Sequence, residues 1–533
     1  MYNLVGGGGN QWNSVFRHNG PYFPPKYEKH NIPVIIKGKT VILPELAEEY
    51  ITSYAHYLDT DYVKKSKFNK NFLSDLNKIL SKDLKLDSMD DIDLYNIKKH
   101  LDRIKENNKN KTKEEKQSNK ERNEKLFEPY KYCIIDGARQ QVGSFIIEPP
   151  GIFVGRGEHP KLGKIKRRIL PEDVTLNLDK NAPIPKPNVE GSWKKIIEAK
   201  DTIWLATYKD NITQKNKYIF TSMESIFKSK SDEKKFDLAK QLKKKIKQIR
   251  DSYMNDLKSN DLSKKQMAVA LYLIDNLALR VGGKKNTKEK ADTVGVTSLR
   301  VEHIDLLNDN TIKLDFLGKD SIKFCKKIKV HPDIYSNLKD FVYNKTGKND
   351  LFNKISASSL NEYLEHFLPN LTAKVWRTYN ASNLFQKELD KLNPDKIKNL
   401  NENEKIKYLL SFFNQANTSV AILCNHQKNV STNFNDQISK INEKINNLKQ
   451  NKLKKTKTAD KQKVTNKINL LKAQKETKTK MKNVSLGTSK NNYIDPRIIF
   501  AFIKKYNLPE EKLFTKSLLT RFQWAKKSDD FRF

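Results

Sequence analysis

The spacing of hydrophobic residues changes along this chain, and the change divides it near residue 230. In the first part, short apolar runs separated by glycine or charged residues predict strands and hairpins. Pro44 opens a predicted helix that extends through Leu58. Residues 104–126 are almost entirely charged or Asn, which predicts an exposed helix or a hinge between lobes. The predicted strands are 34–36 paired with 41–43, 132–135, 144–147, and 202–208 paired with 217–220.

The second part is mainly helical. Apolar residues recur at helical spacing, which predicts helices over 234–258, 264–280, 371–391 and 404–425. One hairpin interrupts these helices, with 313–316 facing 321–329 and Lys319 at its tip. The two parts together predict an α+β multidomain protein.

Residues 430–482 show a third pattern. Apolar residues from Phe434 to Leu448 are spaced 4, 3, 4 and 3 positions apart, and Val464, Ile468 and Leu471 repeat this spacing. Heptads on both sides of a polar, Lys-rich gap predict two helices packed as an antiparallel coiled-coil linker with basic outer faces. A disordered Lys-rich spacer is the alternative.

Composition indicates a polyanionic partner. The chain has 533 residues and a formal net charge of +39, which favours nucleic acid first and an acidic membrane surface second. The simpler explanation is a Lys-, Asn- and Ile-rich composition from an AT-rich genome. The sequence has no run of about 18 apolar residues and no secretory signal, so no membrane-spanning segment and no secretion are expected. Scattered cysteines indicate a reducing compartment and no structural zinc: Cys133, Cys325 and Cys424.

A candidate nucleophile, Tyr493, lies in the stretch Leu-Gly-Thr-Ser-Lys-Asn-Asn-Tyr-Ile-Asp-Pro-Arg, residues 486–497. A tyrosine that breaks a phosphodiester must lose its proton, although its reference pKa is about 10. The transition state gathers negative charge on its non-bridging oxygens, where Arg can donate two hydrogen bonds at once. The departing 5′-oxygen needs a proton donor. Neither a metal nor a nucleotide cofactor is required.

Four further residues are of the types that this chemistry needs. Arg280 closes the predicted helix, Lys319 lies at the hairpin tip, Arg377 lies within 372–382, and His426 follows an apolar run. Taken singly, three of them, Arg280, Lys319 and His426, have a structural explanation. An arginine at a helix C-terminus contacts the terminal carbonyls, a lysine at a hairpin tip is solvated, and a histidine after an apolar run is buried.

The motifs around these five residues resemble those of the eukaryotic-type DNA topoisomerase I family, the type IB enzymes, and occur in the family's order. The resemblance implies that Tyr493 is the nucleophile and that Arg280 and Arg377 stabilise the transition state. It implies that Lys319, with Asp320 beside it, protonates the leaving 5′-oxygen. It also implies that His426 hydrogen-bonds a non-bridging oxygen.

The first half resembles the same family. The stretch 148–161 is similar to the family's clamp segment, which implies that Arg156 reaches the minor groove near the cut. The basic residues that extend this stretch towards phosphates are Lys164, Lys166, Arg167 and Arg168. A DNA-contacting pair of the family is matched by Lys217 and Tyr218. Sensitivity to camptothecin-like inhibitors is implied by matches at Phe153, Arg156, Asp320 and Asn492.

The sequence departs from the family's pattern at several places. We expect a form without the long N-terminal tail, and the linker is short. Val281-Gly282-Gly283-Lys284 stands after Arg280, where the family usually has Gly-Asn-Glu, and Val154 replaces a basic residue of the clamp segment. The first of these substitutions alters the expected surroundings of Arg280.

The resemblance implies a two-lobed DNA clamp with a mixed α/β cap and a mainly helical catalytic lobe similar to that of tyrosine recombinases. Residues 25–112 would form the cap lobe, and an N-terminal segment, 1–24, and the upper clamp region, 113–225, would complete the upper half of the clamp. The remaining expected domains are the catalytic lobe at 226–429, the linker at 430–482, and the C-terminal domain with Tyr493 at 483–533.

The implied activity is relaxation of positive and negative supercoils through a 3′-phosphotyrosyl intermediate. The expected partner is double-stranded DNA, held by a monomer that acts as a clamp without ATP or metal. The expected location is the nucleus, or a viral DNA compartment if the source is viral. A tyrosine recombinase shares the chemistry, but the clamp segment and the linker favour a topoisomerase. A non-catalytic DNA-binding or packaging protein is disfavoured because all five catalytic residue types are present.

Overall fold

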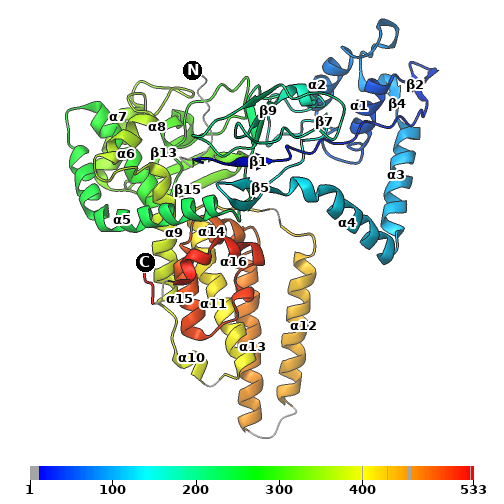
Figure 1. Ribbon diagram of the computed structural model, residues 1–533. Helices are drawn as coiled ribbons and strands as arrows, with labels where there is room; N and C mark the ends of the chain where they lie inside the picture. The colour runs from blue at the N-terminus through cyan, green and yellow to red at the C-terminus, as the bar shows by residue number, and fades with distance from the viewer. Residues whose placement is uncertain (1–10, 399, 429, 454–457, 528–529) are drawn as a thin grey trace. The chain divides into compact units, whose positions relative to one another are not determined.

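The computed structural model describes residues 11–398, 400–428, 430–453, 458–527 and 530–533. These residues form two compact units. The first contains 11–228 and Lys285–Asp292, and the second contains 229–284 and 293–533. Helices and strands occur in both, labelled and coloured along the chain in Figure 1. The coarse prediction of a protein that mixes helix and sheet is therefore confirmed.

Short sheets build the larger part of the first unit. A three-stranded antiparallel sheet has the order β1 (Phe16–His18), β5 (Tyr132–Ile135), β6 (Ala138–Gln141). A four-stranded sheet has the order β10 (Lys195–Ile197), β9 (Val174–Asn177), β11 (Ala206–Lys209), β12 (Asn216–Ile219). Their inward side chains share one buried cluster that includes Trp12, Phe16 and Leu176. The predicted hairpin over 202–220 is confirmed as β11 and β12.

A second cluster in this unit lies beneath the predicted hairpin near residue 36. β2 (Val34–Ile36) pairs with β3 (Lys39–Val41) and β4 (Ile92–Asp93), and Gly38 at the turn has a positive φ of 81°. A side chain at this φ would be strained, so glycine suits the tight turn. The helix predicted after Pro44 is α1 (Glu45–Ala55), which packs with α2 (Ser66–Leu76). A two-stranded ribbon, β7 (Gly151–Ile152) with β8 (Ile165–Lys166), carries the clamp segment.

The predicted strand at 144–147 is wrong. Asp136 and Gly137 both have positive φ, 48° and 80°, and turn β5 directly back into β6. The strand that follows β5 and pairs with it is therefore β6, at 138–141, and not the predicted strand at 144–147. In 144–147 only Ile146 forms an isolated bridge, with Tyr22.

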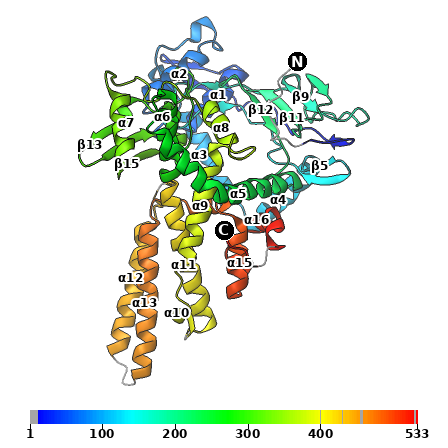
Figure 2. The ribbon, with the colours of Figure 1, turned by 90° about the vertical axis from the view of Figure 1, so that its left-hand side faces the viewer.

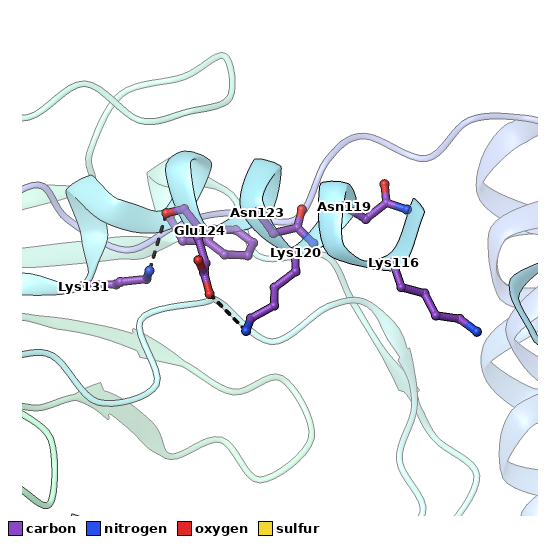
Figure 3. Close-up of a pocket in the computed structure, with 7 residues that line it drawn as sticks. Lys116, Asn119, Lys120, Asn123, Glu124 and Lys131 are labelled. Carbon is purple, nitrogen blue, oxygen red and sulfur yellow. Dashed lines mark hydrogen bonds and ion pairs between the residues drawn. The ribbon is translucent and has the colours of Figure 1, made fainter. Parts of the chain in front are cut away.

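The charged stretch over 104–126 is helical, which confirms the first of its two alternatives. It falls in α3 (Tyr95–Asn110) and α4 (Lys113–Phe127), whose side chains are mostly exposed. Thr112 starts α4 with a capping box to Glu115. Figure 3 shows a shallow hollow along α4, where Lys120 pairs with the Glu124 carboxylate and Lys131 bonds its carbonyl. None of the predicted site residues lines this hollow.

The second unit is mainly helical, as predicted. Its core helices are α5 (Ile226–Asp256), which begins in the first unit, α6 (Leu262–Leu277), α7 (Pro332–Val342), α8 (Ala357–Glu365), α9 (Ala373–Leu389), α10 (Asp395–Lys398) and α11 (Glu402–Leu423). The C-terminal helices are α14 (Leu486–Asn492), α15 (Pro496–Tyr506) and α16 (Lys516–Arg521). One continuous buried cluster joins both sets, including Trp376, Phe413 and Ile494.

The predicted hairpin of this unit is confirmed and belongs to a three-stranded antiparallel sheet. β13 (Ile304–Leu307) pairs with β14 (Thr311–Leu317), which pairs with β15 (Lys323–Lys329). Leu317 faces Lys323 at the last pair, so Lys319 lies in the turn at the tip.

The heptad region forms two helices, α12 (Phe434–Leu453) and α13 (Thr458–Lys480), which lie side by side and run in opposite directions (Figures 1 and 2). Ile441, Ile445 and Ile468 are buried between them, and Leu448, Val464 and Leu471 pack against these residues. The described helices include none with both the length and the apolar character needed to cross a membrane.

Candidate active site

Tyr493 lies in the two-helix corner between α14 and α15. Its N–H donates to the Ser489 carbonyl at 2.9 Å, and its own carbonyl accepts from Ser382 Oγ of α9 at 3.2 Å. Asp495 then begins α15 and accepts from the Arg497 N–H at 3.0 Å. The backbone of the candidate nucleophile is therefore fixed on both sides.

Arg377 is buried beside Tyr493, with 5% of its surface exposed. It projects from α9, and its guanidinium carbon lies 5.0 Å from the centroid of the Tyr493 ring. Nη1 donates to the Ala278 carbonyl at 2.6 Å, and Nη2 donates to the Cys424 carbonyl at 2.9 Å. Two main-chain oxygens from different segments thus hold the guanidinium beside the phenol.

His426 completes this cluster. Its ring stacks on the Tyr493 ring, with centroids 5.2 Å apart, and its Nε2 lies 3.1 Å from Arg377 Nη2. Burial, followed by the charges of Arg377 and Arg280, lowers the pKa of His426 to about 3. The ring is therefore neutral at ordinary pH.

The position of Arg280 differs from the prediction. It does not close a helix, because α6 ends at Leu277 and Ala278 adopts a left-handed φ of 49°. Arg280 lies in the irregular segment beyond, where its carbonyl accepts from the Val296 N–H at 2.9 Å. The periodicity of the sequence could not show this, since an alanine gives no local signal for a helix end.

Within the departure after Arg280, Gly282 has a structural reason. Gly282, with a φ of 80°, lies against Gly295, and a Cβ added to either would meet the other's Cα at 2.5 Å. The two backbones cross without room for side chains. This crossing, together with the bond from Thr297 N–H to the Val281 carbonyl, fixes the chain that carries Arg280.

The electrostatics of the cluster favour the phenolate. Burial raises the pKa of Tyr493, but the charges of Arg377 and Arg280 and hydrogen bonds from both arginines lower it, and the net shift is downward. A buried tyrosine ordinarily shifts upward. Two fixed cations thus prepare this phenol to lose its proton.

The structure brings together four of the five predicted catalytic residues, and Lys319 is the fifth. Lys319 is exposed at the β14–β15 tip, and among the described residues no hydrogen bond, ion pair or ring contact joins it to the other four. The hairpin is nevertheless tied to the site. Both Asn425 and Gln427, which flank His426, donate to the Lys323 carbonyl at 3.1 Å.

The predicted DNA-contacting residues near these groups are Asp320 and Asn492. Asp320 is exposed in the hairpin turn, with a left-handed φ of 66°. Asn492 is exposed at the end of α14, where its amide donates to the Thr488 carbonyl at 3.2 Å and its own carbonyl accepts from Lys235 Nζ at 3.1 Å. Both therefore lie next in sequence to a predicted catalytic residue and reach the surface.

The other predicted DNA contacts lie in the first unit. Arg156 is exposed between Gly155 and Gly157, both of which have positive φ. Lys217 and Tyr218 are half-buried on β12, and Lys217 pairs with Glu148 at 2.5 Å. Each of the four basic residues after the clamp segment has a carboxylate partner: Lys164 with Asp75, Lys166 with Glu148, Arg167 with Asp173, and Arg168 with Glu49.

Two positioning residues were not predicted. Asp275 is buried within the apolar helix α6 and accepts from Arg250, Tyr253 and Trp376, the residue before Arg377. Ser489 is fully buried, and its Oγ lies 2.7 Å from His426 Nδ1. A carboxylate inside an apolar helix is a signal that could have identified Asp275. Ser489 has no comparable signal beyond its place in the Tyr493 motif.

The site defines a class of protein in which a tyrosine lies beside two arginines and a neutral histidine. Three family models match the chain: "Eukaryotic DNA topoisomerase I, DNA binding fragment" over residues 10–221, "Eukaryotic DNA topoisomerase I, catalytic core" over 224–481, and "C-terminal topoisomerase domain" over 465–533. The chain belongs to the eukaryotic DNA topoisomerase I family, so the predicted family and enzyme class are confirmed.

Individual relatives agree with this assignment. The chain is similar to DNA topoisomerase 1 beta of Arabidopsis thaliana (40% identical over 99% of this chain and 60% of the relative). It is similar to DNA topoisomerase 1 of Caenorhabditis elegans (40%, covering 97% and 67%) and of Homo sapiens (37%, covering 97% and 71%). The chain thus spans about two thirds of the length of these relatives.

Proposed function

We propose that this chain relaxes supercoiled DNA by transient cleavage of one strand at Tyr493. The phenolate oxygen attacks a backbone phosphorus, the bond from phosphorus to the 5′-oxygen breaks, and a 3′-phosphotyrosyl bond forms. Rotation of the free end and reversal of the same step restore the strand. The observation that supports this best is the pair of arginines on the phenol, which lowers the pKa of Tyr493 despite its burial.

The same arginines suit the transition state. Attack places extra negative charge on the non-bridging oxygens, and fixed donors aimed there lower the barrier. Arg377 Nε is buried and has no hydrogen-bond partner among the described residues. An unsatisfied buried donor is costly, and a phosphate oxygen is an acceptor of the kind that it lacks. Arg280 and His426 would donate further hydrogen bonds to the non-bridging oxygens of the phosphate.

Lys319 would supply the proton that the departing 5′-oxygen needs. A lysine on an exposed hairpin tip can reach a substrate that lies beyond the protein surface, and the bonds from Asn425 and Gln427 hold that hairpin to the His426 segment. Asp320 beside it and Asn492 beside Tyr493 would contact DNA at the cut, which is also where a camptothecin-like inhibitor would bind.

We also propose that the chain acts on DNA as a clamp. A monomer that holds nicked DNA must surround it through phosphates and without strong sequence preference. Arg156, Lys217 and Tyr218 of the first unit would contribute to that grip, with Lys217 exchanging Glu148 for a phosphate. α12 and α13 would act as a coiled-coil linker with basic outer faces. The place of action would be the nucleus or a viral DNA compartment.

The test is relaxation of positively and negatively supercoiled plasmid in EDTA without ATP. The expected result is full relaxation by the natural chain and none by Tyr493→Phe. Tyr343→Phe is a matched control, because Tyr343 is 75% exposed and has no role in the site. A strict requirement for magnesium or ATP, or activity that survives Tyr493→Phe, would contradict the proposal.

A further inference from the structure

Ser489 links the candidate nucleophile to the histidine that stacks on it. Its Oγ lies 2.7 Å from His426 Nδ1, and its carbonyl accepts from the N–H groups of Tyr493 at 2.9 Å and Ile494 at 3.0 Å. The His426 carbonyl in turn accepts from the Ser485 N–H at 2.8 Å. The start of α14 is thus bound to His426 through both main chain and side chain.

The contacts of His426 decide where its ring proton lies. A guanidinium can only donate hydrogen bonds, so Nε2, 3.1 Å from Arg377 Nη2, must accept. A neutral imidazole carries a single N–H, and this ring is neutral because its pKa is lowered to about 3. The proton therefore lies on Nδ1, and Nδ1–H donates to Ser489 Oγ.

This arrangement conflicts with the role proposed for His426. To hydrogen-bond a non-bridging phosphate oxygen, the ring must present an N–H at the nitrogen that does not face Ser489, because the oxygen can only accept. In the structure that nitrogen, Nε2, carries a lone pair. A neutral ring cannot have an N–H at both nitrogens, so the two states require different tautomers.

We propose that Ser489 is a positioning residue for His426. It allows the His426 ring to change tautomer when a phosphate oxygen takes the place of His426 Nε2 as the hydrogen-bond partner of Arg377. In the structure as described, Ser489 Oγ accepts from Nδ1–H. In the DNA complex its hydroxyl proton rotates and donates to Nδ1, while Nε2–H donates to the phosphate. One proton leaves Nδ1 and one arrives at Nε2 by exchange with water, so the ring gains no charge.

The serine hydroxyl suits both states because it is a donor and an acceptor. Alanine is neither, so Ser489→Ala would leave Nδ1 without a partner in a site where Ser489 is fully buried. This inference rests on the proposed function, since it assigns a change of state to the same histidine.

The direct test is nitrogen NMR of the full chain labelled with 15N-histidine, with the His426 signals identified by His426→Gln. The free protein should show a protonated Nδ1 and an unprotonated Nε2. Tyr493→Phe bound to a DNA duplex should show the reverse, because phenylalanine keeps the ring stack but forms no covalent bond. The same tautomer in both states, or a doubly protonated ring in either, would overturn the proposal.

Kinetics separate a positioning role from a structural one. Ser489→Ala should slow single-turnover cleavage of an oligonucleotide by about tenfold or more, because a wrong tautomer is costly in catalysis, and should leave DNA affinity unchanged. Ser489→Thr, which keeps the hydroxyl, should cleave faster than Ser489→Ala. Ser485→Ala is the matched control and should cleave normally, because Ser485 Oγ contacts Thr488 and not His426.

The outcomes are distinguishable from failure of the proposed function. A chain that relaxes plasmid while His426 keeps one tautomer refutes the role of Ser489 alone. A chain that fails to relax plasmid refutes the function, and the NMR of the free protein still reports the resting tautomer. Wild-type cleavage by Ser489→Ala would contradict the inference even if the tautomers are as expected.

Discussion

The rings of His426 and Tyr493 lie against each other at an interplanar angle of 29°. Arg377 touches both, with its guanidinium over one ring and 3.1 Å from a nitrogen of the other. A charged imidazolium here would face Arg377 and Arg280, whereas a neutral ring does not oppose them. Because the ring is neutral, the positive charges that act on the phenol are those of the two arginines.

Tyr493→Phe should abolish covalent capture of DNA and leave non-covalent binding within about twofold, because only the nucleophilic oxygen is lost. The measurement is the yield of denaturant-trapped adducts beside a binding titration at one salt concentration. Adducts that persist with phenylalanine would identify another tyrosine as the nucleophile.

Replacing either arginine should shift the pH dependence of cleavage. Arg377 and Arg280 lower the pKa of Tyr493, so Arg280→Gln should raise that pKa and move the rising limb of the rate profile to higher pH. The rate at neutral pH should also fall about 100-fold or more, through lost transition-state stabilisation. Single-turnover cleavage from pH 6 to pH 10 measures both effects. A lower rate with an unmoved profile would mean that Arg280 does not act on the phenol.

The crossing of Gly282 and Gly295 should tolerate no side chain. Gly295→Ala would place a Cβ 2.5 Å from Gly282 Cα and 2.7 Å from the Arg280 carbonyl. We expect a loss of about 1–3 kcal/mol in the free energy of unfolding, together with slower cleavage. Gly283→Ala is the matched control, since its Cβ would meet no atom of the described residues within 4 Å. Urea unfolding and cleavage rates of the two variants test this. Equal stability and equal cleavage rates of Gly295→Ala and Gly283→Ala would refute the prediction.

Acid should destabilise the first unit through His18. This buried ring bonds the Asn177 carbonyl through Nε2 and accepts from the Gly20 N–H, and burial lowers its pKa to about 4. The unfolded chain protonates this histidine below about pH 6.5, but the folded chain does not, so stability falls as the pH drops from 6.5 towards 4. The loss between pH 7 and pH 5 should be about 2 kcal/mol.

His18→Gln should have a lower free energy of unfolding at pH 7, but that free energy should depend less on pH. Urea unfolding, followed by signals of the first unit, measures both effects. His366→Gln, which alters an exposed histidine, serves as the control and should keep the dependence. An unchanged slope in His18→Gln would assign the acid sensitivity to other groups.

Shortening the hairpin of α12 and α13 should preserve cleavage. Deleting 447–453 and 458–464 would remove Leu448 and Val464 but retain Ile441, Ile445, Ile468 and Leu471 of the buried cluster. It would also retain the bond from Gln415 Nε2 to Thr477 Oγ1 that ties α13 to α11. Fewer lysines should then reach DNA beyond the cut, so plasmid relaxation should change its dependence on salt. Cleavage of a suicide oligonucleotide and relaxation across a salt series test this. Loss of cleavage in a folded variant would show that the distal hairpin positions Tyr493.

Local pattern in the sequence was sufficient for several elements of this protein, whereas others, such as β6, β9 and α7, were not predicted. The hairpin around Gly38, the hairpin that carries Lys319 and the helices α9 and α11 follow from spacing that is complete within a few residues. The family motifs likewise indicated Tyr493, Arg377 and His426 as candidate site residues one by one, because each motif is contiguous. The spacing of apolar residues gave a wrong prediction at 144–147 and at the end of α6. A turn of the backbone, which apolar spacing does not reveal, takes the place of the predicted strand and ends the helix early.

Only the tertiary structure decided how these residues meet. Ser489 and His426 are 63 positions apart, and Arg377 and Ala278 are 99 apart. The sequence gives the types of these groups but not their contacts, since a hydrogen bond across such separations depends on how the helices pack. The same is true of Lys285–Asp292, which belongs to the first unit although the chain on both sides belongs to the second, and where Glu289 pairs with Lys161 at 2.5 Å. Sequence thus determined which chemistry is available, and packing determined which atoms face each other and so the charge of the histidine and the acidity of the tyrosine.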